Sequence, residues 1–170
     1  MSLRHKWSYL RGQMLHRNLL LNAMNNAVAI RAALADKNGV MPFCLHPYSS
    51  RNHFGVDKNQ CPVEEVPTRR LDGVWSELGL TSLRAIKMDV EGAEELVLRG
   101  GRQLLFNLPP ILIFEINPEA RAALGMSPSG AWDFLCSLGY KFFAIQKGAA
   151  RRIHTPPIGG NVVAATTILV

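Results

Sequence analysis

The sequence of 170 residues predicts an α/β fold whose sheet is mostly parallel and finishes in an antiparallel hairpin. Segments with helical periodicity alternate with strand-like segments along the chain, which is typical of α/β domains. Residues 110–116 (PILIFEI) are almost continuously apolar, as expected for a parallel strand that is covered on both faces. The last two strand-like segments follow one another without a helix between them. A chain of this length forms one ordinary domain, which we expect to span residues 1–170.

The first third of the chain is predicted to contain one helix and two strands. Apolar residues recur at helical spacing over residues 7–24, and two asparagines then end the helix, because asparagine tolerates the left-handed conformation. Residues 27–34 are a short apolar run that predicts a buried strand. After a turn, residues 40–45 are predicted to form a strand, which Pro42 places at a sheet edge.

The middle of the chain begins with a change in composition. Residues 46–67 are rich in proline, glycine, serine and asparagine, which predicts a long loop. Three elements are expected after this loop: a helix over residues 71–78, a strand over residues 83–90 and a helix over residues 93–106 that is broken at Gly100-Gly101.

The C-terminal third is predicted to hold a capped helix and the final hairpin. Ser127 fits the N-cap position and Pro128 the first helical position, while Gly139 closes the helix. The strand-like segments over residues 140–145 and 161–170 are joined by a loop. Without a helix between them, these two strands are expected to pair in antiparallel fashion.

Composition excludes several classes of protein. With 48% apolar and 19% charged residues, the chain resembles soluble globular proteins and differs from disordered ones. The most apolar block, residues 108–116, is too short to cross a bilayer and contains Glu115. Residues 1–21 lack the compact apolar stretch and cleavage site of a signal peptide.

The net charge of +6 is concentrated at the two ends of the chain. Residues 1–35 and 141–170 contain lysines and arginines but no aspartate or glutamate. Such a basic N-terminus is compatible with contact to nucleic acid or anionic lipid, and it also resembles an organelle transit peptide. We favour a solvated helix face, because aromatic residues are not interleaved with the charges.

The three cysteines predict free thiols. Cys44, Cys61 and Cys136 are an odd number and form no CxxC pair, which argues against a disulfide framework and against a zinc site. We therefore expect no metal and a reducing compartment, the cytoplasm.

Three carboxylates are predicted to meet at one rim of the sheet. Over residues 86–91 the side chains of Ile86, Met88 and Val90 alternate with charged ones. Asp89 and Glu91 follow directly after this strand, and Glu115 ends the next one. Open α/β sheets bind ligands at the carboxyl ends of their strands.

These acids also have a purely structural explanation. Asp89 would then pair with Lys87, and Glu91 would interact with the N-terminus of the following helix. As a set, however, convergent acids in a crevice suit substrate or metal binding or proton transfer, and we favour that function.

Two weaker candidate groups lie upstream of the rim. His46 and His53 are in the long loop and are compatible with an acceptor or metal site, although loop histidines are more often simply solvated. Arg69-Arg70 is compatible with steering an anionic acceptor, but we favour a surface pair ahead of a helix.

The acidic turn and its surroundings resemble the FkbM family of methyltransferases. Residues 86–101 (IKMDVEGAEELVLRGG), followed by residues 109–116 (PPILIFEI), match its strand–turn–helix and next-strand pattern. Residues 68–78 (TRRLDGVWSEL) and 29–43 (AIRAALADKNGVMPF) resemble two further family segments upstream. The resemblance covers roughly residues 15–145 and is fairly specific, because several pieces occur in order at the right spacing.

The resemblance implies a Rossmann-like class I methyltransferase fold and S-adenosylmethionine as cofactor. The usual reaction would be O-methylation of a hydroxyl on a sugar or another small acceptor. Asp89 and Glu91 would lie beside the methyl-transfer site, and one of them, or Glu115, would accept or orient the proton of the acceptor. Ala33 and Leu34 would contact the adenine.

The sequence departs from the family pattern at its start. No two glycines are separated by one residue, and no acid precedes Asp36, so the cofactor's glycine-rich loop and ribose-binding acid are missing. We therefore predict a sheet that lacks the first two strands and a chain that by itself binds S-adenosylmethionine weakly or not at all.

Three functions remain open from the sequence. The chain is a methyltransferase whose missing strands come from an upstream segment, a non-catalytic remnant or interaction module that retains the second half of the fold, or a small basic nucleic-acid binder. The last is supported only by charge. We favour the methyltransferase, acting on a small-molecule or glycan acceptor with no nucleic acid and no membrane span.

Overall fold

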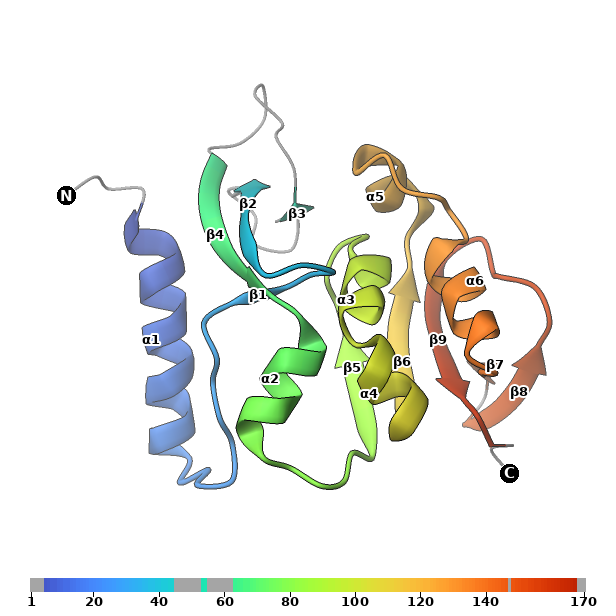
Figure 1. The fold of residues 1–170 in the computed structure, drawn as a ribbon, viewed down its shortest axis with the longest axis horizontal. Coiled ribbons are helices and arrows are strands. Elements are labelled where there is room, and N and C mark those ends of the chain that lie inside the picture. The colour runs from blue at the N-terminus through green and yellow to red at the C-terminus, as the bar shows by residue number, and fades with distance from the viewer. Residues whose placement is uncertain (1–4, 45–52, 55–62, 147, 168–170) are drawn as a thin grey trace.

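A computed structural model describes residues 5–44, 53–54, 63–146 and 148–167, with side chains from residue 13 onward except for 53–54. The strands form two sheets, which we name sheet A and sheet B (Figure 1). The helices are α1 (His5–Leu21), α2 (Leu71–Leu78), α3 (Glu94–Gly100), α4 (Arg102–Asn107), α5 (Pro118–Ala123) and α6 (Gly130–Ser137).

Sheet A is built from the N-terminal half of the chain. Its strand order is β1 (Ala33–Leu34), β4 (Val63–Arg69), β2 (Gly39–Cys44) and β3 (His53–Phe54). β1 pairs with β4 in parallel, while β2 pairs with both β4 and β3 in antiparallel fashion.

Sheet B is built from the C-terminal half. Its strand order is β5 (Ala85–Met88), β6 (Ile111–Ile116), β9 (Gly160–Ala165), β7 (Lys141–Gln146) and β8 (Ala149–Ile153). β5 and β6 are parallel, and the pairings of β9 with β6 and β7, and of β7 with β8, are antiparallel. The fold is therefore α/β as predicted, but the prediction of one mostly parallel sheet is wrong: two mixed sheets form, in which antiparallel pairs predominate among the described strands.

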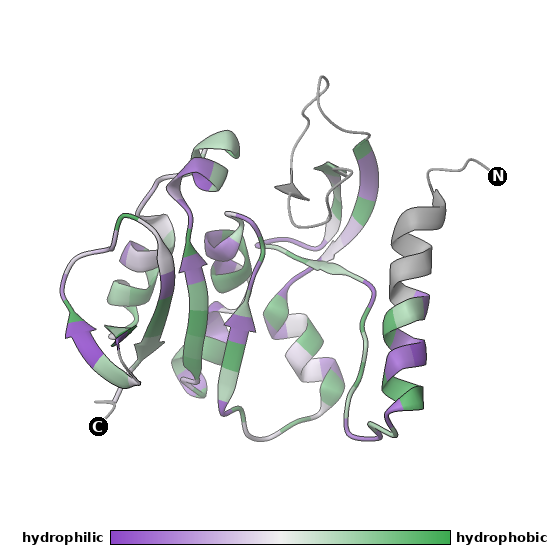
Figure 2. Ribbon diagram, turned by 180° about the vertical axis from the view of Figure 1, so that it is seen from behind, coloured by the Kyte–Doolittle hydropathy of each residue, from purple (hydrophilic) through white to green (hydrophobic). Residues whose placement is uncertain are grey.

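The two faces of sheet B differ. Helices α3, α4 and α6 cover one face (Figure 1), whereas none of the described helices lies in front of β5 and β6 when the molecule is seen from behind (Figure 2). Along β6 the side chains alternate accordingly, because Leu112 and Phe114 are buried while Ile111 is exposed and Ile113 is half-buried. The prediction that this strand is covered on both faces is therefore wrong for the described part of the chain.

The main hydrophobic core fills the space between sheet B and its helices. Within it, Trp132 of α6 stacks on Phe142 of β7, with 3.6 Å between ring centroids. Other members include Met88, Val97, Leu98, Leu105, Leu112, Phe114, Leu135 and Val162. Because these residues come from every layer of the C-terminal half, their burial fixes α3 and α6 against the strands that carry the predicted rim.

Close backbone packing joins the two sheets. A Cβ built on Gly100, at the end of α3, would lie 2.1 Å from the carbonyl oxygen of Ala35, directly after β1. Only glycine permits this approach. The predicted break of the helix is confirmed here, since α3 ends at Gly100 and α4 begins at Arg102.

Several N-terminal predictions need correction. The first helix ends at Leu21, earlier than predicted, and only Ala33–Leu34 of the predicted strand over residues 27–34 pairs with a neighbour. Val28 and Ile30 remain exposed, because none of the described strands lies beside them. The long loop predicted over residues 46–67 is also wrong at its end, where β4 places Pro67 opposite Val40.

The predicted edge position of Pro42 is wrong. β2 lies between β4 and β3, so it is not an edge strand. Pro42 is opposite Glu65 of β4, and the described pairing of β2 with β3 covers Phe43 and Cys44.

Two C-terminal predictions also change. The N-cap of α6 is Ser129 and not Ser127, whose carbonyl oxygen instead accepts hydrogen bonds from Gly130 N–H and Arg121 Nε. The predicted loop after β7 contains strand β8, which pairs with β7. The predicted antiparallel arrangement of the last segments is confirmed by the β7–β9 pairing.

The cysteines do not all remain free. Cys136 is a free, exposed thiol, as predicted for a free cysteine. Cys44 is fully buried and disulfide-bonded, which contradicts the prediction; its partner lies outside the described residues. The spacing of the cysteines along the sequence does not show which of them meet in the fold, so this bond was not predicted. With a disulfide present, the cysteines no longer argue for a reducing compartment. In the described part of the chain, no helix is long and apolar enough to span a bilayer.

Candidate functional site

Asp89 and Glu115 come at the carboxyl edge of sheet B. Met88, the last residue of β5, is in register with Phe114 of β6, and each acid is the next residue along the chain. Met88 and Phe114 point into the core. Since side chains alternate along a strand, Glu115 of β6 lies on the opposite face, and the same alternation continued past the end of β5 predicts that face for Asp89. The predicted convergence of these two carboxylates is therefore consistent with the register.

Asp89 makes a weak surface ion pair. Its Oδ2 lies 3.6 Å from Lys87 Nζ, and the two side chains are 63% and 67% exposed. This is the pairing expected from the structural explanation of the sequence. An exposed pair of this kind contributes about 0–1 kcal/mol to stability, so stability alone gives little reason for an acid here.

Glu91 occupies an unusual backbone conformation. Its φ is +49°, and the following Gly92 has φ +92°, so the chain turns sharply between β5 and α3. A left-handed conformation costs a non-glycine residue roughly 1–3 kcal/mol and is enriched at functional sites. Glu91 is half-buried and interacts with the rest of the chain. This turn is therefore the most strained part of the predicted rim.

Gly92 fits the turn against the backbone of α5. A Cβ on Gly92 would come within 2.8 Å of the carbonyl carbon of Ala120 and 2.9 Å of Arg121 N. A side chain at this position would therefore clash with the main chain, in addition to being strained by the positive φ.

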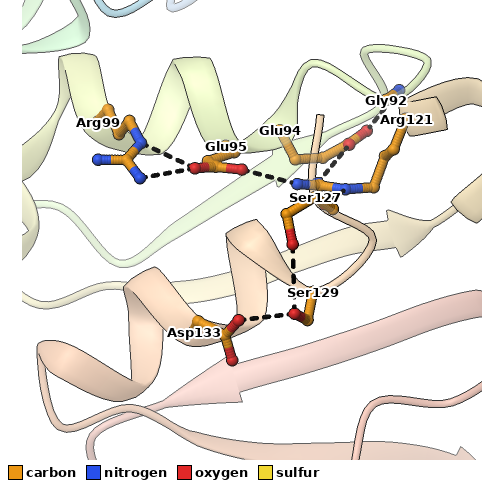
Figure 3. Close-up of polar contacts among 8 residues, drawn as sticks. All are labelled: Gly92, Glu94, Glu95, Arg99, Arg121, Ser127, Ser129 and Asp133. Atoms are coloured by element: carbon orange, nitrogen blue, oxygen red, sulfur yellow. Dashed lines mark hydrogen bonds and ion pairs between the residues drawn. The ribbon is translucent and has the colours of Figure 1, made fainter. Parts of the chain in front are cut away.

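A buried charge cluster lies directly behind the turn (Figure 3). It consists of Glu94 and Glu95, in the first turn of α3, and Arg121 of α5, whose side chains are nearly inaccessible. Arg121 Nη2 donates to Glu95 Oε2 at 2.9 Å, and Nη1 lies 3.6 Å from Glu94 Oε2. The guanidinium is thereby paired with two carboxylates inside the protein.

Further hydrogen bonds extend the cluster to its surroundings. Glu94 Oε1 accepts a hydrogen bond from Gly92 N–H at 3.3 Å, and Arg121 Nε donates to the carbonyl of Ser127 at 2.8 Å. On the solvent side Arg99 Nε donates to Glu95 Oε1 at 2.9 Å. The cluster therefore connects the acidic turn with α5 and with the segment before α6 (Figure 3).

Burial dominates the electrostatics of Glu94. Desolvation raises the pKa of Glu94 above its ordinary value, and this effect exceeds the opposing hydrogen bonds from the backbone and the attraction of Arg121. Ionised Glu94 is thus tolerated in the fold at a cost in free energy.

This cluster was not predicted from the sequence. The motif quoted for the resemblance contains Glu94 and Glu95, but among the acids only Asp89, Glu91 and Glu115 were predicted to have a role. Two adjacent acids at the start of a helix look like ordinary helix-dipole partners. The signal that they are buried is Arg121, 26 residues further along the chain, and no local pattern connects it to them.

Ala33 and Leu34 lie elsewhere. They form β1 of sheet A and pair with Thr68 and Arg69, and Leu34 packs against the main core. The following residue, Ala35, contacts Gly100 at the C-terminal end of α3, whereas the acidic turn precedes its N-terminal end. The structure therefore does not bring these two residues together with the three acids.

The weaker candidates have structural roles or lie outside the described residues. Arg69 pairs with Glu77, and Arg70 Nη2 pairs with Asp72 Oδ2 at 2.9 Å, as expected for a surface pair. His46 lies outside the described residues, and for His53 only its place in β3 is described. Among the residues whose side chains are described, no group of three or more histidines, cysteines or acids is arranged to hold a metal ion.

Comparison with known families gives one match. A family model described as the Methyltransferase FkbM domain matches residues 15–142, which is most of the chain and includes the strands of sheet A and strands β5 and β6 of sheet B. No curated protein and no solved structure matches the sequence.

Proposed function

Because the chain belongs to the FkbM methyltransferase family, we propose that it is an S-adenosylmethionine-dependent methyltransferase domain. Its acceptor would be a hydroxyl group on a sugar or another small molecule. The observation that supports this proposal is the register of β5 and β6, by which Asp89 and Glu115 come at the same edge of sheet B, next to the strained turn at Glu91.

The carboxylates supply the chemistry that O-methylation requires from the protein. A hydroxyl becomes a better nucleophile when a carboxylate accepts its proton, which typically accelerates such a reaction about 10²–10⁴-fold. Asp89 is largely exposed and only weakly paired, so a hydroxyl can reach it without displacing a buried partner. Glu115, on the neighbouring strand, would orient the same acceptor.

The described residues do not form a complete site for S-adenosylmethionine. The cofactor is a cation with an adenosine and an amino-acid end, so it needs donors and acceptors along its whole length. Ala33 and Leu34, proposed for the adenine, are separated from the acidic rim by the length of α3. We therefore derive no reaction step through the cofactor and assign to this chain the acceptor side of the reaction.

An interaction module is the alternative, and two observations favour it. β5 pairs only with β6 among the described strands, so its other edge is open there. In α1, Leu20 and Leu21 are 67% and 70% exposed. Open strand edges and uncovered apolar side chains are both features of surfaces that bind another polypeptide.

Transfer of a labelled methyl group separates the two proposals. The purified chain is incubated with millimolar S-adenosylmethionine labelled in its methyl group and a panel of methyl glycosides and small polyols. A methyltransferase transfers label to at least one of these hydroxyl acceptors. Absence of label in every acceptor would contradict the proposed activity and favour the interaction module.

Calorimetry tests the cofactor separately. Because the described residues hold only part of a cofactor site, titration of the chain with S-adenosylmethionine is expected to give a dissociation constant weaker than micromolar. A micromolar or tighter constant would show that the chain has a complete cofactor site and would overturn this assignment.

A further inference from the structure

The side chain of Glu94 connects the strained turn at Glu91 with the protein interior. Glu94 Oε1 accepts the N–H of Gly92, so the carboxylate of Glu94 fixes the second residue of the turn. Glu94 is 1% exposed and cannot reach water to satisfy its charge. Among the described residues its Oε2 accepts no hydrogen bond, but it is paired with a buried cation at 3.6 Å.

Arg121 is that cation, and several contacts fix its position. It is 2% exposed, pairs with Glu95 Oε2 at 2.9 Å, and donates to the carbonyl of Ser127 at 2.8 Å. A Cβ on Gly130, at the start of α6, would lie 1.8 Å from Glu95 Oε2 and 3.0 Å from Arg121 Nη2. α6 is therefore packed directly onto the cluster and leaves it no room to rearrange.

The backbone of the same helix holds the turn from the other side. Gly92 is so close to Ala120 and Arg121 N that even a methyl group would clash. α5 thus contacts the turn twice: by its main chain at Gly92 and by the Arg121 side chain through Glu94.

Stability is a poor explanation for these buried charges. Burying two carboxylates and a guanidinium costs several kcal/mol per ion, and apolar residues of similar size are often as stable or more so. The raised pKa of Glu94 shows this cost in the present fold. Apolar side chains could make neither the hydrogen bond to the turn at Gly92 nor the one from Arg121 Nε to the Ser127 carbonyl.

We infer that Arg121 is a positioning residue, which acts through Glu94 to keep the Glu91–Gly92 turn in its left-handed conformation. The link from this turn to methyl transfer rests on the proposed function, but the conformational effect does not. By fixing the backbone of Glu91, the cluster fixes the geometry of the rim on which an acceptor would bind.

NMR of the whole ¹⁵N/¹³C-labelled chain tests the inference. The three-bond HN–Hα coupling and the Cα shift of Glu91 report whether its φ is positive. We expect the left-handed signature in the wild type and its loss in Arg121→Met. Arg99→Met is the matched control, since Arg99 contacts the same Glu95 from the solvent side, and it should leave the Glu91 signals unchanged.

A second variant covers the case in which Arg121→Met, with two unpaired buried acids, does not fold. The triple variant Arg121→Met, Glu94→Met and Glu95→Met removes all three charges and keeps an apolar interior. Loss of the left-handed signature at Glu91 in this folded chain supports the inference. An unchanged Glu91 signature in either folded variant overturns it.

The NMR result is independent of methyl transfer. If the wild type transfers no label but its Glu91 signature depends on Arg121, the proposed function fails and the positioning role stands. If the wild type is active and the Glu91 signals do not change in the Arg121 variants, the proposed function stands and the positioning role fails.

Discussion

Two sets of acids flank the same turn and differ in almost every physical property. Glu94 and Glu95 are 1% and 7% exposed and share the guanidinium of Arg121, whereas the side chain of Asp89 is 63% exposed and has only Lys87 nearby. Residues of one chemical type, within six positions of one another, are thus divided by burial into two roles. Glu94 and Glu95 lie in the interior behind the turn, and Asp89 is exposed to solvent.

The difference follows from the cost of desolvation. A buried carboxylate must be paired and hydrogen-bonded, so its geometry is fixed and its removal disturbs several elements. An exposed carboxylate keeps most of its hydration, contributes little to folding and is free to exchange water for a hydroxyl. Variants of the buried acids should therefore lower mainly stability, and variants of the exposed acid should lower mainly activity.

The largest effect on stability is expected for Arg121→Met. It leaves two buried acids without their cation, which should lower the free energy of unfolding by about 3–5 kcal/mol. Urea denaturation followed by circular dichroism measures the change. Arg99→Met, which removes only a half-exposed partner of Glu95, should cost about 1 kcal/mol or less. Equal losses in both variants would contradict the division into buried and exposed charges.

Gly92→Ala tests the backbone contact of the turn. Its Cβ would meet Ala120 at 2.8 Å with φ at +92°, so overpacking adds to left-handed strain and the expected loss is about 2–4 kcal/mol. Gly125→Ala is the matched control, since Gly125 also has positive φ but open space around its Cβ. Only strain of about 1–2 kcal/mol is expected there. A loss at Gly92 no greater than at Gly125 would show that α5 does not constrain the turn.

Glu94→Gln is expected to change the pH dependence of stability. The pKa of Glu94 is raised in the folded state, so the folded chain binds this proton more tightly than the unfolded chain does. The favourable contribution of Glu94 is thus present at low pH and is lost as the pH rises through the folded-state pKa. Relative to wild type, the glutamine variant should gain stability as the pH rises above the ordinary pKa of glutamate, about 4.3, and through the raised pKa of the folded state. Urea unfolding of both chains over this pH range measures the difference in their free energies of unfolding. A difference that does not change with pH would contradict the predicted direction.

Part of this arrangement was predictable from the sequence because it depends on local patterns. The helix over residues 71–78, the break after Gly100 and the strand ending at Ile116 follow from periodicity, glycine and apolar runs. The position of the acidic turn also followed, since an apolar strand and a helix bracket it. Its assignment as a site remains a prediction.

The remainder depends on contacts distant in sequence. Pro67 was predicted to end a loop. It lies instead in β4, opposite Val40, because β4 pairs with β2 in antiparallel fashion. Arg151 and Arg152 are in the segment predicted as a loop before the last strand. They lie in β8, whose place at the end of sheet B depends on its pairing with β7. Burial of Glu94 and Glu95 depends on Arg121 in another helix.

The smallest effect on stability is expected for Asp89→Asn. It removes one exposed ion pair and should change the free energy of unfolding by about 0.5 kcal/mol or less. Urea denaturation alongside the wild type measures this change. A loss comparable to that of Arg121→Met would show that Asp89 belongs to the architecture and not to the ligand-binding rim.

The most direct test of the account is the rate of methyl transfer by this same Asp89→Asn variant, measured with the acceptor that the wild type labels. If Asp89 accepts the acceptor's proton, the rate should fall about 10²-fold or more while the stability is preserved. Glu65→Gln removes an exposed acid of sheet A and should retain the wild-type rate. Equal rates in Asp89→Asn and wild type would contradict a catalytic role for the exposed acid.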